Sequence, residues 1–256
     1  MLRAAPRGGP GEPCKSRPTR GKAMKTTQQT RRFRLLVATS ATALLASGTL
    51  SAAEPPPQVS PEGLHLVKQT KQRLVYMKPG ASFAQYQRVA ILDCYVEFQK
   101  NWQQDYNRDA ASLDSRVSDA DVQRMKTGLA SEFKRVFSEE LQKKGGYQVV
   151  DVAAPDVLLL RPALLNVAVT APDVMSANVR SVVVRSAGQA TLYLELWDSA
   201  TNTILARVMD AKADDRPVAQ TANRVTNTAA ADAILRSWAQ ELRARLDAVR
   251  AKPAEQ

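Results

Sequence analysis

Cysteine and histidine are nearly absent from this chain, and their scarcity excludes several kinds of chemistry. The 256 residues contain two cysteines, Cys14 and Cys94, and one histidine, His65. These are too few ligands for a zinc site built from histidine and cysteine. Any Ser-His-Asp or Cys-His arrangement would have to use His65, and a pairing with Cys94 stays open. We expect no catalytic residues, no metal and no cofactor.

A long apolar run is also missing. The most apolar stretch, 35–48, is shorter than the roughly 18–20 residues that a membrane-spanning helix needs. Three arginines in 31–34 precede it, and small residues follow, with Ser51 and Ala53 at the −3 and −1 positions of a cleavage site. This order of positive charge, short apolar core and small residues predicts a secretory signal peptide.

The apolar run does not end in a cysteine, which separates this signal from that of a lipoprotein. Thr49 stands near the place where a lipoprotein has its acylated cysteine, and Cys14 lies far upstream. We therefore expect a soluble periplasmic product, with neither a lipid anchor nor a membrane span after cleavage.

The start of the chain has two interpretations. Residues 1–23 are rich in proline, glycine and arginine, whereas Met24 opens a more regular signal peptide. We expect translation to begin at Met24, which makes 1–53 an N-terminal extension followed by the signal. The arginine pair at 31–32 hints at twin-arginine export, but Arg34 interrupts that motif, so general secretion is the prediction and the other route stays open.

The positive charge of the chain is confined to its beginning. The formal net charge is +11, yet 1–53 holds ten of the 36 basic residues and one of the 25 acidic ones. The mature chain therefore carries 26 basic and 24 acidic residues. Nucleic-acid binding needs a persistent basic face, which this near balance disfavours.

The mature chain is about 200 residues long, which suits one domain with a sizeable core. We expect a Pro-rich, extended leader at 54–63, a single domain at 64–250 and a disordered tail at 251–256. With Cys94 as its only cysteine, the mature chain has no internal disulfide.

Hydrophobic periodicity predicts two helices and five strands. Apolar residues at three- and four-residue spacing mark helices at 118–146, capped by Ser118, and at 221–250. The segment 100–117 shows little regular pattern. Runs rich in β-branched, aromatic or alternating apolar residues predict the strands, at 88–99, 147–152, 156–170, 190–198 and 203–212. This order favours an α+β fold: a two-layer sandwich in which two main helices pack on one face of a mostly antiparallel sheet.

The segment 190–198 alternates cleanly between two kinds of side chain. Leucines at 192, 194 and 196 share one face of the predicted strand, and Tyr193, Glu195 and Trp197 share the other. We expect the leucine face to be the better covered one. The Tyr193, Glu195 and Trp197 face is the candidate interaction face, with core packing of Trp197 as the alternative.

Two acidic patterns invite a functional interpretation. Asp105, Asn107 and Asp109 begin like a calcium loop, but Ala110 and Arg116 stand where such a loop needs glycine and glutamate, so a solvated loop is expected. A second set of acids could serve as an unrecognised carboxylate site: Asp93, Glu97, Asp210 and Asp214, the last followed by Asp215 and Arg216.

Several segments together resemble a known family. They occur in the order GLHLVKQT, VYMKPGASFAQYQRVAILD, VEFQKNWQQDYNR, DVLLLRPALLNV and GQATLYLELWDSATNTILARVMDAKADDR. The stretch from about residue 60 to 250 is similar to the bacterial domain-of-unknown-function family 3313. The resemblance implies an exported protein of a Gram-negative envelope with a one-domain α/β architecture, and it implies no activity. Many members are regarded as lipoproteins, from which this chain departs at Thr49.

The sequence therefore predicts an exported periplasmic protein that acts as a non-catalytic binding or assembly module of the cell envelope. Its expected partner is another envelope protein, and its oligomeric state stays open. The alternatives are a periplasmic hydrolase that uses the carboxylates named above and a carrier of a small molecule or lipid.

Overall fold

The computed structural model describes residues 55–110, 112–170, 182–184, 188–213, 220–222 and 224–251. The expected signal peptide, with Met24, Ser51 and Ala53, lies outside the described residues. The same holds for Asp214, Asp215 and Arg216 and for 252–256 of the expected tail.

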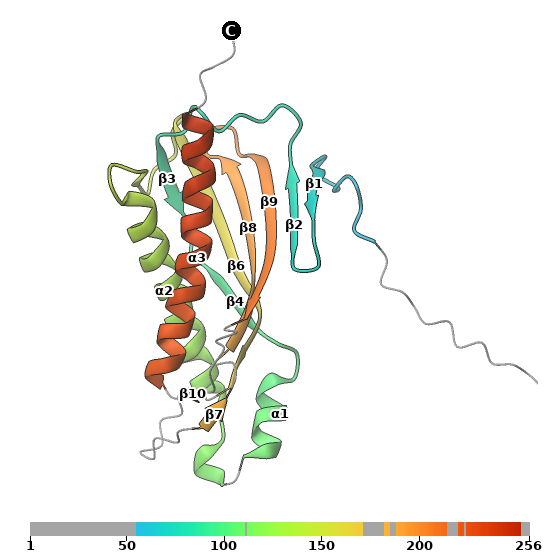
Figure 1. Cartoon of the computed structure of the whole chain (residues 1–256), viewed down its shortest axis with the longest axis vertical. Helices are drawn as coiled ribbons and strands as arrows, with labels where there is room; N and C mark the ends of the chain where they lie inside the picture. Colours follow the sequence, from blue (N-terminus) through green and yellow to red (C-terminus); the bar gives the residue numbers. More distant parts are fainter. Residues whose placement is uncertain are drawn as a thin grey trace, which may run out of the picture. The chain divides into compact units, whose positions relative to one another are not determined.

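One sheet of eight strands forms the first layer of the fold (Figure 1). Its hydrogen-bonded order is β1-β2-β9-β8-β6-β3-β5, and β4 pairs with β6. The pairs from β1 to β6 along this order are antiparallel, whereas β3, β4 and β5 join in parallel. The strands are β1 (His65–Gln69), β2 (Arg73–Met77), β3 (Arg88–Ile91), β4 (Tyr95–Phe98), β5 (Gln148–Val149), β6 (Val157–Val169), β8 (Gly188–Asp198) and β9 (Thr203–Ala213). A separate two-stranded sheet pairs β7 (Val182–Val184) with β10 (Gln220–Ala222).

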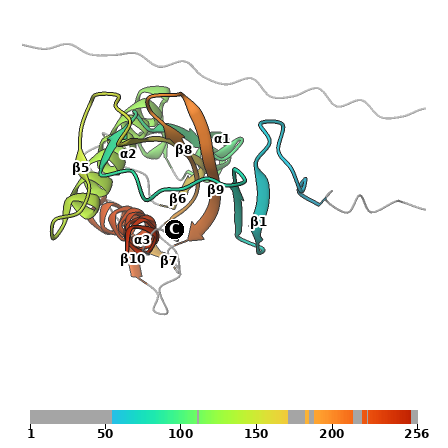
Figure 2. The same ribbon diagram turned by 90° about the horizontal axis from the view of Figure 1, so that it is seen from above.

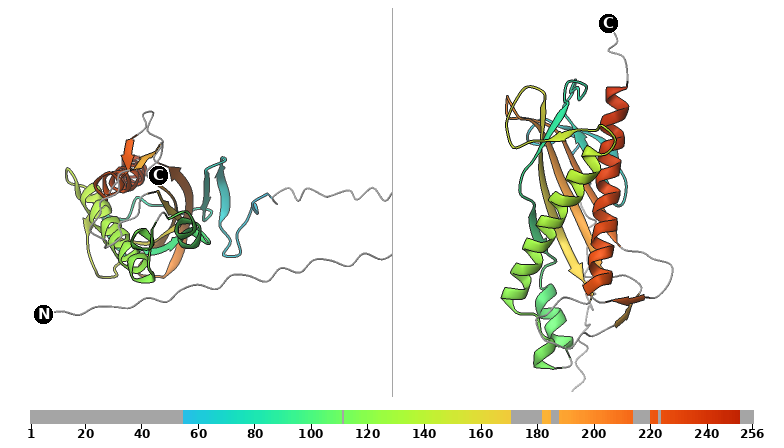
Figure 3. Two further views of the ribbon diagram at one scale, coloured as in Figure 1. Left: turned by 90° about the horizontal axis from the view of Figure 1, so that it is seen from below. Right: turned by 90° about the vertical axis from the view of Figure 1, so that its left-hand side faces the viewer.

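Two long helices, α2 (Asp119–Gln142) and α3 (Arg224–Arg250), lie side by side over one face of the large sheet (Figures 2 and 3). The fold is thus the predicted α+β sandwich with its helices on one face. Within the described part of the chain, no helix is long and apolar enough to cross a membrane.

The core lies between these helices and the sheet. Its helix side consists of the predicted apolar stripes, of which Phe133, Phe137 and Trp238 are buried. Its sheet side includes the leucines of β8 at 192, 194 and 196, which are at most 5% exposed. The expectation that the leucine face is the better covered one is therefore confirmed.

The helix α2 begins where the sequence predicts. The Ser118 side chain accepts a hydrogen bond from the backbone of Asp121 at 3.2 Å, and the Asp121 carboxylate accepts one from the backbone of Ser118 at 2.8 Å. This reciprocal capping box satisfies two backbone donors that the first turn of a helix leaves unpaired.

The prediction of one continuous strand at 88–99 is wrong. The segment is two strands, β3 and β4, which pair with β6 on either side of a break at 92–94. The pairing offset to β6 changes by one residue across the break, from Ile91 opposite Leu160 to Tyr95 opposite Ala163. A hydrophobic pattern alone does not reveal such a shift.

The segment 100–117, which shows little periodicity, contains the helix α1 (Trp102–Asp109) and a short 3₁₀ turn at Leu113–Ser115. The sequence of α1 lacks the apolar stripe that marks a packed helix, and accordingly none of its residues is fully buried. Contacts to the rest of the fold hold it instead: Trp102 Nε1 donates to the Val169 carbonyl at 3.2 Å, and Asn107 Nδ2 donates to that of Val117 at 2.8 Å.

The N-terminal part of the described chain is more structured than the expected leader. Residues 58–64 form a turn, in which Gly63, with a φ of 80°, donates to the Ser60 carbonyl at 2.9 Å. Val59 then bridges to His65 at the start of β1. The strands β1 and β2 were not expected from the sequence, whereas the strand expected at 147–152 shrinks to two residues.

The capping box generates a prediction. Ser118→Ala should lower the free energy of unfolding by about 1 kcal/mol, because the backbone amide of Asp121 in the first turn of α2 loses its acceptor. Urea unfolding of the purified protein measures this change. Ser131→Ala, at an exposed position inside the same helix, is the control and should leave stability unchanged or raise it slightly. Equal effects of the two substitutions would contradict the capping role.

Candidate functional site

A polar cluster occupies the sheet face opposite the helices. At its centre Glu195, whose side chain is 8% exposed, accepts hydrogen bonds from Tyr193 Oη at 2.7 Å and Trp197 Nε1 at 3.1 Å. The guanidinium of Arg207 on the neighbouring strand β9 donates to the same carboxylate from Nε at 3.1 Å and Nη2 at 2.9 Å. We call Tyr193, Glu195, Trp197 and Arg207 the Glu195 cluster.

The turn at 58–64 is attached to this cluster. Arg207 donates to Glu62 from Nη2 at 2.8 Å and from Nη1 at 3.2 Å, so one guanidinium joins two carboxylates. Beside this contact a small apolar cluster of Leu64, Tyr76 and Ile204 is buried, and Trp197 packs against it. The turn therefore covers part of the helix-free face.

The hydrogen bonds change the acidity of the cluster. Burial alone would raise the pKa of Glu195, but donors from Tyr193, Arg207 and Trp197 outweigh it and hold that pKa below its usual value. Burial and the bond to Glu195 raise the pKa of Tyr193 to about 12. The Arg207 and Ser60 hydrogen bonds lower the pKa of Glu62 from 4.5 to about 2. At neutral pH the carboxylates of Glu195 and Glu62 and the guanidinium that joins them are thus all charged.

The structure places the candidate interaction face away from the helices, as the alternation predicts. Tyr193 and Trp197 are half-buried, whereas Glu195 is buried. Trp197 packs against the apolar cluster with a half-buried side chain, which agrees with the packing alternative, and its role in an interaction face stays a prediction.

Two arginines of this face were missed by sequence reasoning. Arg161 on β6 lies opposite Glu195, with a side chain that is 65% exposed and an Nη1 atom 4.0 Å from Glu195 Oε2. Arg207 lies opposite Glu195 on the other side. Both contacts depend on strand register. The predicted hairpin between 190–198 and 203–212 brings Arg207 near Glu195 without fixing the register, and no sequence pattern places Arg161 beside it.

Asp210 and Glu97, two of the four proposed carboxylates, lie far apart in the sheet. Asp210 on β9 is buried on the helix side, where Arg73 donates to it at 2.9 and 2.7 Å and Trp238 Nε1 donates at 2.8 Å. Glu97 is exposed on β4, which is separated from β9 in the sheet by β6 and β8. Asp93 lies in the break after β3, and Asp214 is outside the described residues.

Pairing of His65 with Cys94 is contradicted by the sheet order. His65 is exposed on the edge strand β1, whereas Cys94 lies beside β6, on the order of 20 Å away at the usual strand spacing. Burial raises the pKa of the Cys94 thiol to about 12, which is the behaviour of a packed residue and not of a nucleophile.

The pattern Asp105, Asn107 and Asp109 lies in the helix α1, not in the solvated loop expected from the sequence. Asp105 pairs with Arg108 at 2.8 Å, and Asn107 holds the backbone of Val117. In the part of the chain that the structure describes, no group of three or more histidine, cysteine, aspartate or glutamate side chains could hold a metal ion.

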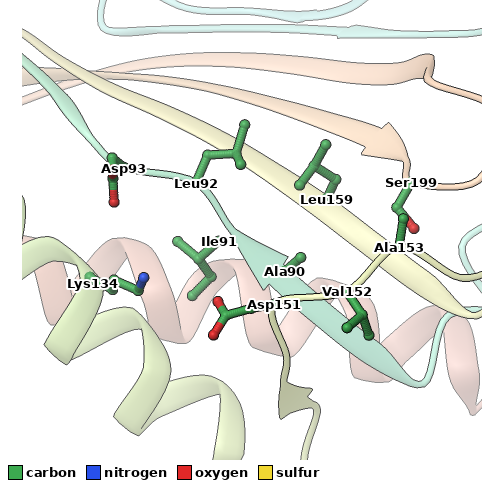
Figure 4. A pocket seen from close by; sticks show the side chains of 10 residues that line it. All are labelled: Ala90, Ile91, Leu92, Asp93, Lys134, Asp151, Val152, Ala153, Leu159 and Ser199. Carbon is green, nitrogen blue, oxygen red and sulfur yellow. The ribbon is translucent and has the colours of Figure 1, made fainter.

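A cavity of about 350 Å³ opens beside the end of β3 (Figure 4). Its walls come from β3 and the break after it, from the segment that follows β5, and from Lys134 on α2. Asp93 and Asp151 contribute carboxylates, and Leu92 and Val152 contribute apolar side chains. Of the residues that line it, only Asp93 belongs to a pattern that is recognisable in the sequence.

The family described as Protein of unknown function (DUF3313) matches residues 60–242, and the chain belongs to this family. The resemblance noted from the sequence is thereby confirmed. No curated protein matches the chain.

The solved structures that match the chain share little sequence with it. A PelC dodecamer from Paraburkholderia phytofirmans is 11% identical, with 67% of this chain and 98% of that chain covered and a TM-score of 0.34. Protein XCC0632 from Xanthomonas campestris, of family-model DUF330, is 12% identical, with 67% and 89% covered and a TM-score of 0.34. A PDZ domain protein from Parabacteroides distasonis is 10% identical, with 71% and 37% covered and a TM-score of 0.33.

A double-mutant cycle tests the Glu195 cluster. Arg207→Gln should cost about 3 kcal/mol in stability, because the buried carboxylate of Glu195 loses its only hydrogen-bonded cation and keeps just the more distant, exposed Arg161. The double variant with Glu195→Gln should cost about 1–2 kcal/mol less than the sum of the single variants. Denaturant unfolding measures all four proteins.

The matched control for this cycle is the exposed pair of Asp105 and Arg108, whose side chains are 57% and 72% exposed. Its coupling energy should stay below about 0.5 kcal/mol. A coupling between Arg207 and Glu195 no larger than this control would contradict the structural role of the cluster.

The lowered pKa of Glu62 predicts that the stability of the fold depends on pH in the acid range. A carboxylate with a depressed pKa stabilises the fold above its unfolded pKa, and this contribution is lost as the pH falls through the folded value. Glu62→Gln should therefore lower stability by up to about 1 kcal/mol at pH 7, as expected for an exposed ion pair. The difference should shrink between pH 4.5 and 2, the values that bound the shift. Unfolding curves that stay equally far apart from pH 7 to 2 would contradict it.

Proposed function

We propose that this protein is an exported, non-catalytic module of the bacterial cell envelope that binds another envelope protein through the helix-free face of its sheet. The signal-like segment at 31–53 supports export. The composition of the helix-free face supports binding.

One observation carries the proposal: Tyr193, Trp197 and Arg161 lie together on a rigid sheet face that the helices leave uncovered. Tyrosine, tryptophan and arginine are the residue types that most often dominate the energy of protein interfaces. The buried network around Glu195 fixes the orientation of both aromatic rings, so little side-chain entropy is lost when a partner binds.

The acids of the described chain support a binding role in another way. Asp210 on β9 and Glu195 on β8 are buried carboxylates of these strands. Each accepts hydrogen bonds from an arginine and from a tryptophan Nε1 group. A general acid or base needs a group that is free to reach a substrate proton. Here these side chains stabilise the fold.

A cross-linking experiment tests the proposal. The chain with its own signal and a C-terminal tag is expressed in its Gram-negative host, cross-linked in cells and purified. We expect one envelope protein in near-stoichiometric amount, and a recovered bait whose N-terminus is Glu54. Arg161→Glu should lower the recovery at least fivefold, because it reverses the charge at the centre of the proposed face.

Arg108→Glu is the matched control, with the same change of charge at a side chain that is 72% exposed on α1. It should leave the recovery unchanged. A cytoplasmic bait with residues 24–53 intact would refute export, and equal recovery with both variants would refute this face as the contact.

A further inference from the structure

The sheet has an interrupted edge beside β3. The strand β5 pairs with β3 over only two positions, Arg88 with Gln148 and Val89 with Val149. The last hydrogen bond of this ladder runs from the Val150 amide to the Val89 carbonyl, at 2.9 Å. Beyond it the chain leaves the edge, while β3 continues to Ile91.

The backbone of Ile91 faces this open edge. Successive residues of a strand direct their amide and carbonyl groups to opposite neighbours, and the Leu92 amide donates to the Leu160 carbonyl of β6 at 3.0 Å. Ile91 therefore faces the side on which β5 has ended. Among the described residues, none makes a hydrogen bond to the Ile91 amide or carbonyl there, although Ile91 is only 4% exposed. Backbone groups of buried residues are nearly always paired with protein or water, and here the described chain leaves both groups available to an added strand.

The cavity in Figure 4 lies along the same edge and is bordered by exposed apolar side chains. Leu92 is 44% and Val152 is 56% exposed, so two exposed apolar side chains of the described chain line one cavity. Apolar side chains beside unpaired backbone groups are the surroundings that a strand-forming peptide needs.

The charges around the cavity favour a basic ligand. In Figure 4 Lys134 and Asp151 point toward one another, and Asp93 contributes a further carboxylate at the same end of the sheet. Two acids against one lysine leave the site with an excess of one negative charge. Both carboxylates are exposed, so they can contact a cation that approaches from solvent.

We propose that this edge binds an extended peptide segment of a partner protein, which adds as a strand beside β3 and carries a lysine or arginine next to an apolar residue. The main chain of the segment pairs with the amide and carbonyl of Ile91. Its basic side chain contacts Asp93 and Asp151, and its apolar side chain packs on Leu92 and Val152.

The opposite edge of the sheet does not offer such a site. The edge strand β1 carries Lys68, and its pairing with β2 is interrupted by a bulge between Leu66 and Lys68. Charged residues and bulges are the usual means by which proteins prevent strand addition. The edge at Ile91 has neither between Ala90 and Leu92.

A displayed library of random 12-residue peptides, selected on residues 54–256, tests the proposal. We expect enriched peptides with a lysine or arginine flanked by β-branched residues, and synthetic copies of them that bind with micromolar Kd. Bound peptide should slow hydrogen exchange of the Ile91 amide at least tenfold in NMR, because that amide gains an acceptor. N-methylation of one peptide position should abolish binding, as main-chain pairing requires.

Charge-reversal variants supply the matched comparison. Asp93→Lys with Asp151→Lys should weaken binding at least tenfold. Asp105→Lys with Asp109→Lys changes the net charge equally at exposed positions on α1 and should change Kd less than twofold.

Three results would overturn the proposal. They are the failure to select any peptide that saturates below about 100 μM, equal binding to both double variants, and an Ile91 amide whose exchange does not change. Concentration-dependent dimerisation that Asp93→Lys with Asp151→Lys abolishes would also refute it, because the edge would then belong to a second copy. The envelope partner and its dependence on Arg161 are measured separately, so either proposal can fail while the other stands.

Discussion

Burial of one face of the sheet under α2 and α3 is the constraint on which the rest of this structure depends. The leucines of β8 at 192, 194 and 196 and those of β6 at 158, 160 and 164 are nearly inaccessible beneath the two helices. Each such side chain contributes roughly 1.5–3 kcal/mol when it leaves water. Because side chains of a strand alternate between its faces, this burial forces Tyr193, Glu195 and Trp197 onto the opposite side.

That opposite side is stabilised by a different kind of interaction. A carboxylate at the centre of a sheet face is costly to bury unless donors surround it, and three residues donate to Glu195. The same arginine that neutralises Glu195 also holds Glu62, so the N-terminal turn, the hairpin and the aromatic rings form one connected unit. The interrupted edge beside β3 differs from both faces. No side chain or backbone group of the described chain bonds the amide and carbonyl of Ile91 there.

The elements with a strong pattern were predictable, and those without one were not. The helices α2 and α3 and the strands β6, β8 and β9 follow from periodicity, because their apolar spacing matches the face that they bury. The helix α1 escaped prediction since tertiary hydrogen bonds, not an apolar stripe, hold it. In the candidate site, Tyr193, Glu195 and Trp197 could be named from alternation alone. Their partner Arg207 could not, because a simple hairpin that pairs Asp198 with Thr203 would place Ala206 opposite Glu195, and the bulge after Leu196 moves Arg207 there instead.

The sequence by itself determined the class of fold, which residues of β8 share a face, and the family, since all three depend on local alternation and order along the chain. Apart from the hairpin of β8 and β9, only the tertiary structure decided which strands are neighbours, where registers shift, and where β5 leaves the edge of β3. Those features depend on contacts between residues far apart in the sequence, such as Glu62 with Arg207 and Arg73 with Asp210. No local pattern encodes such contacts, because each one exists only when the packed sheet brings its two partners together.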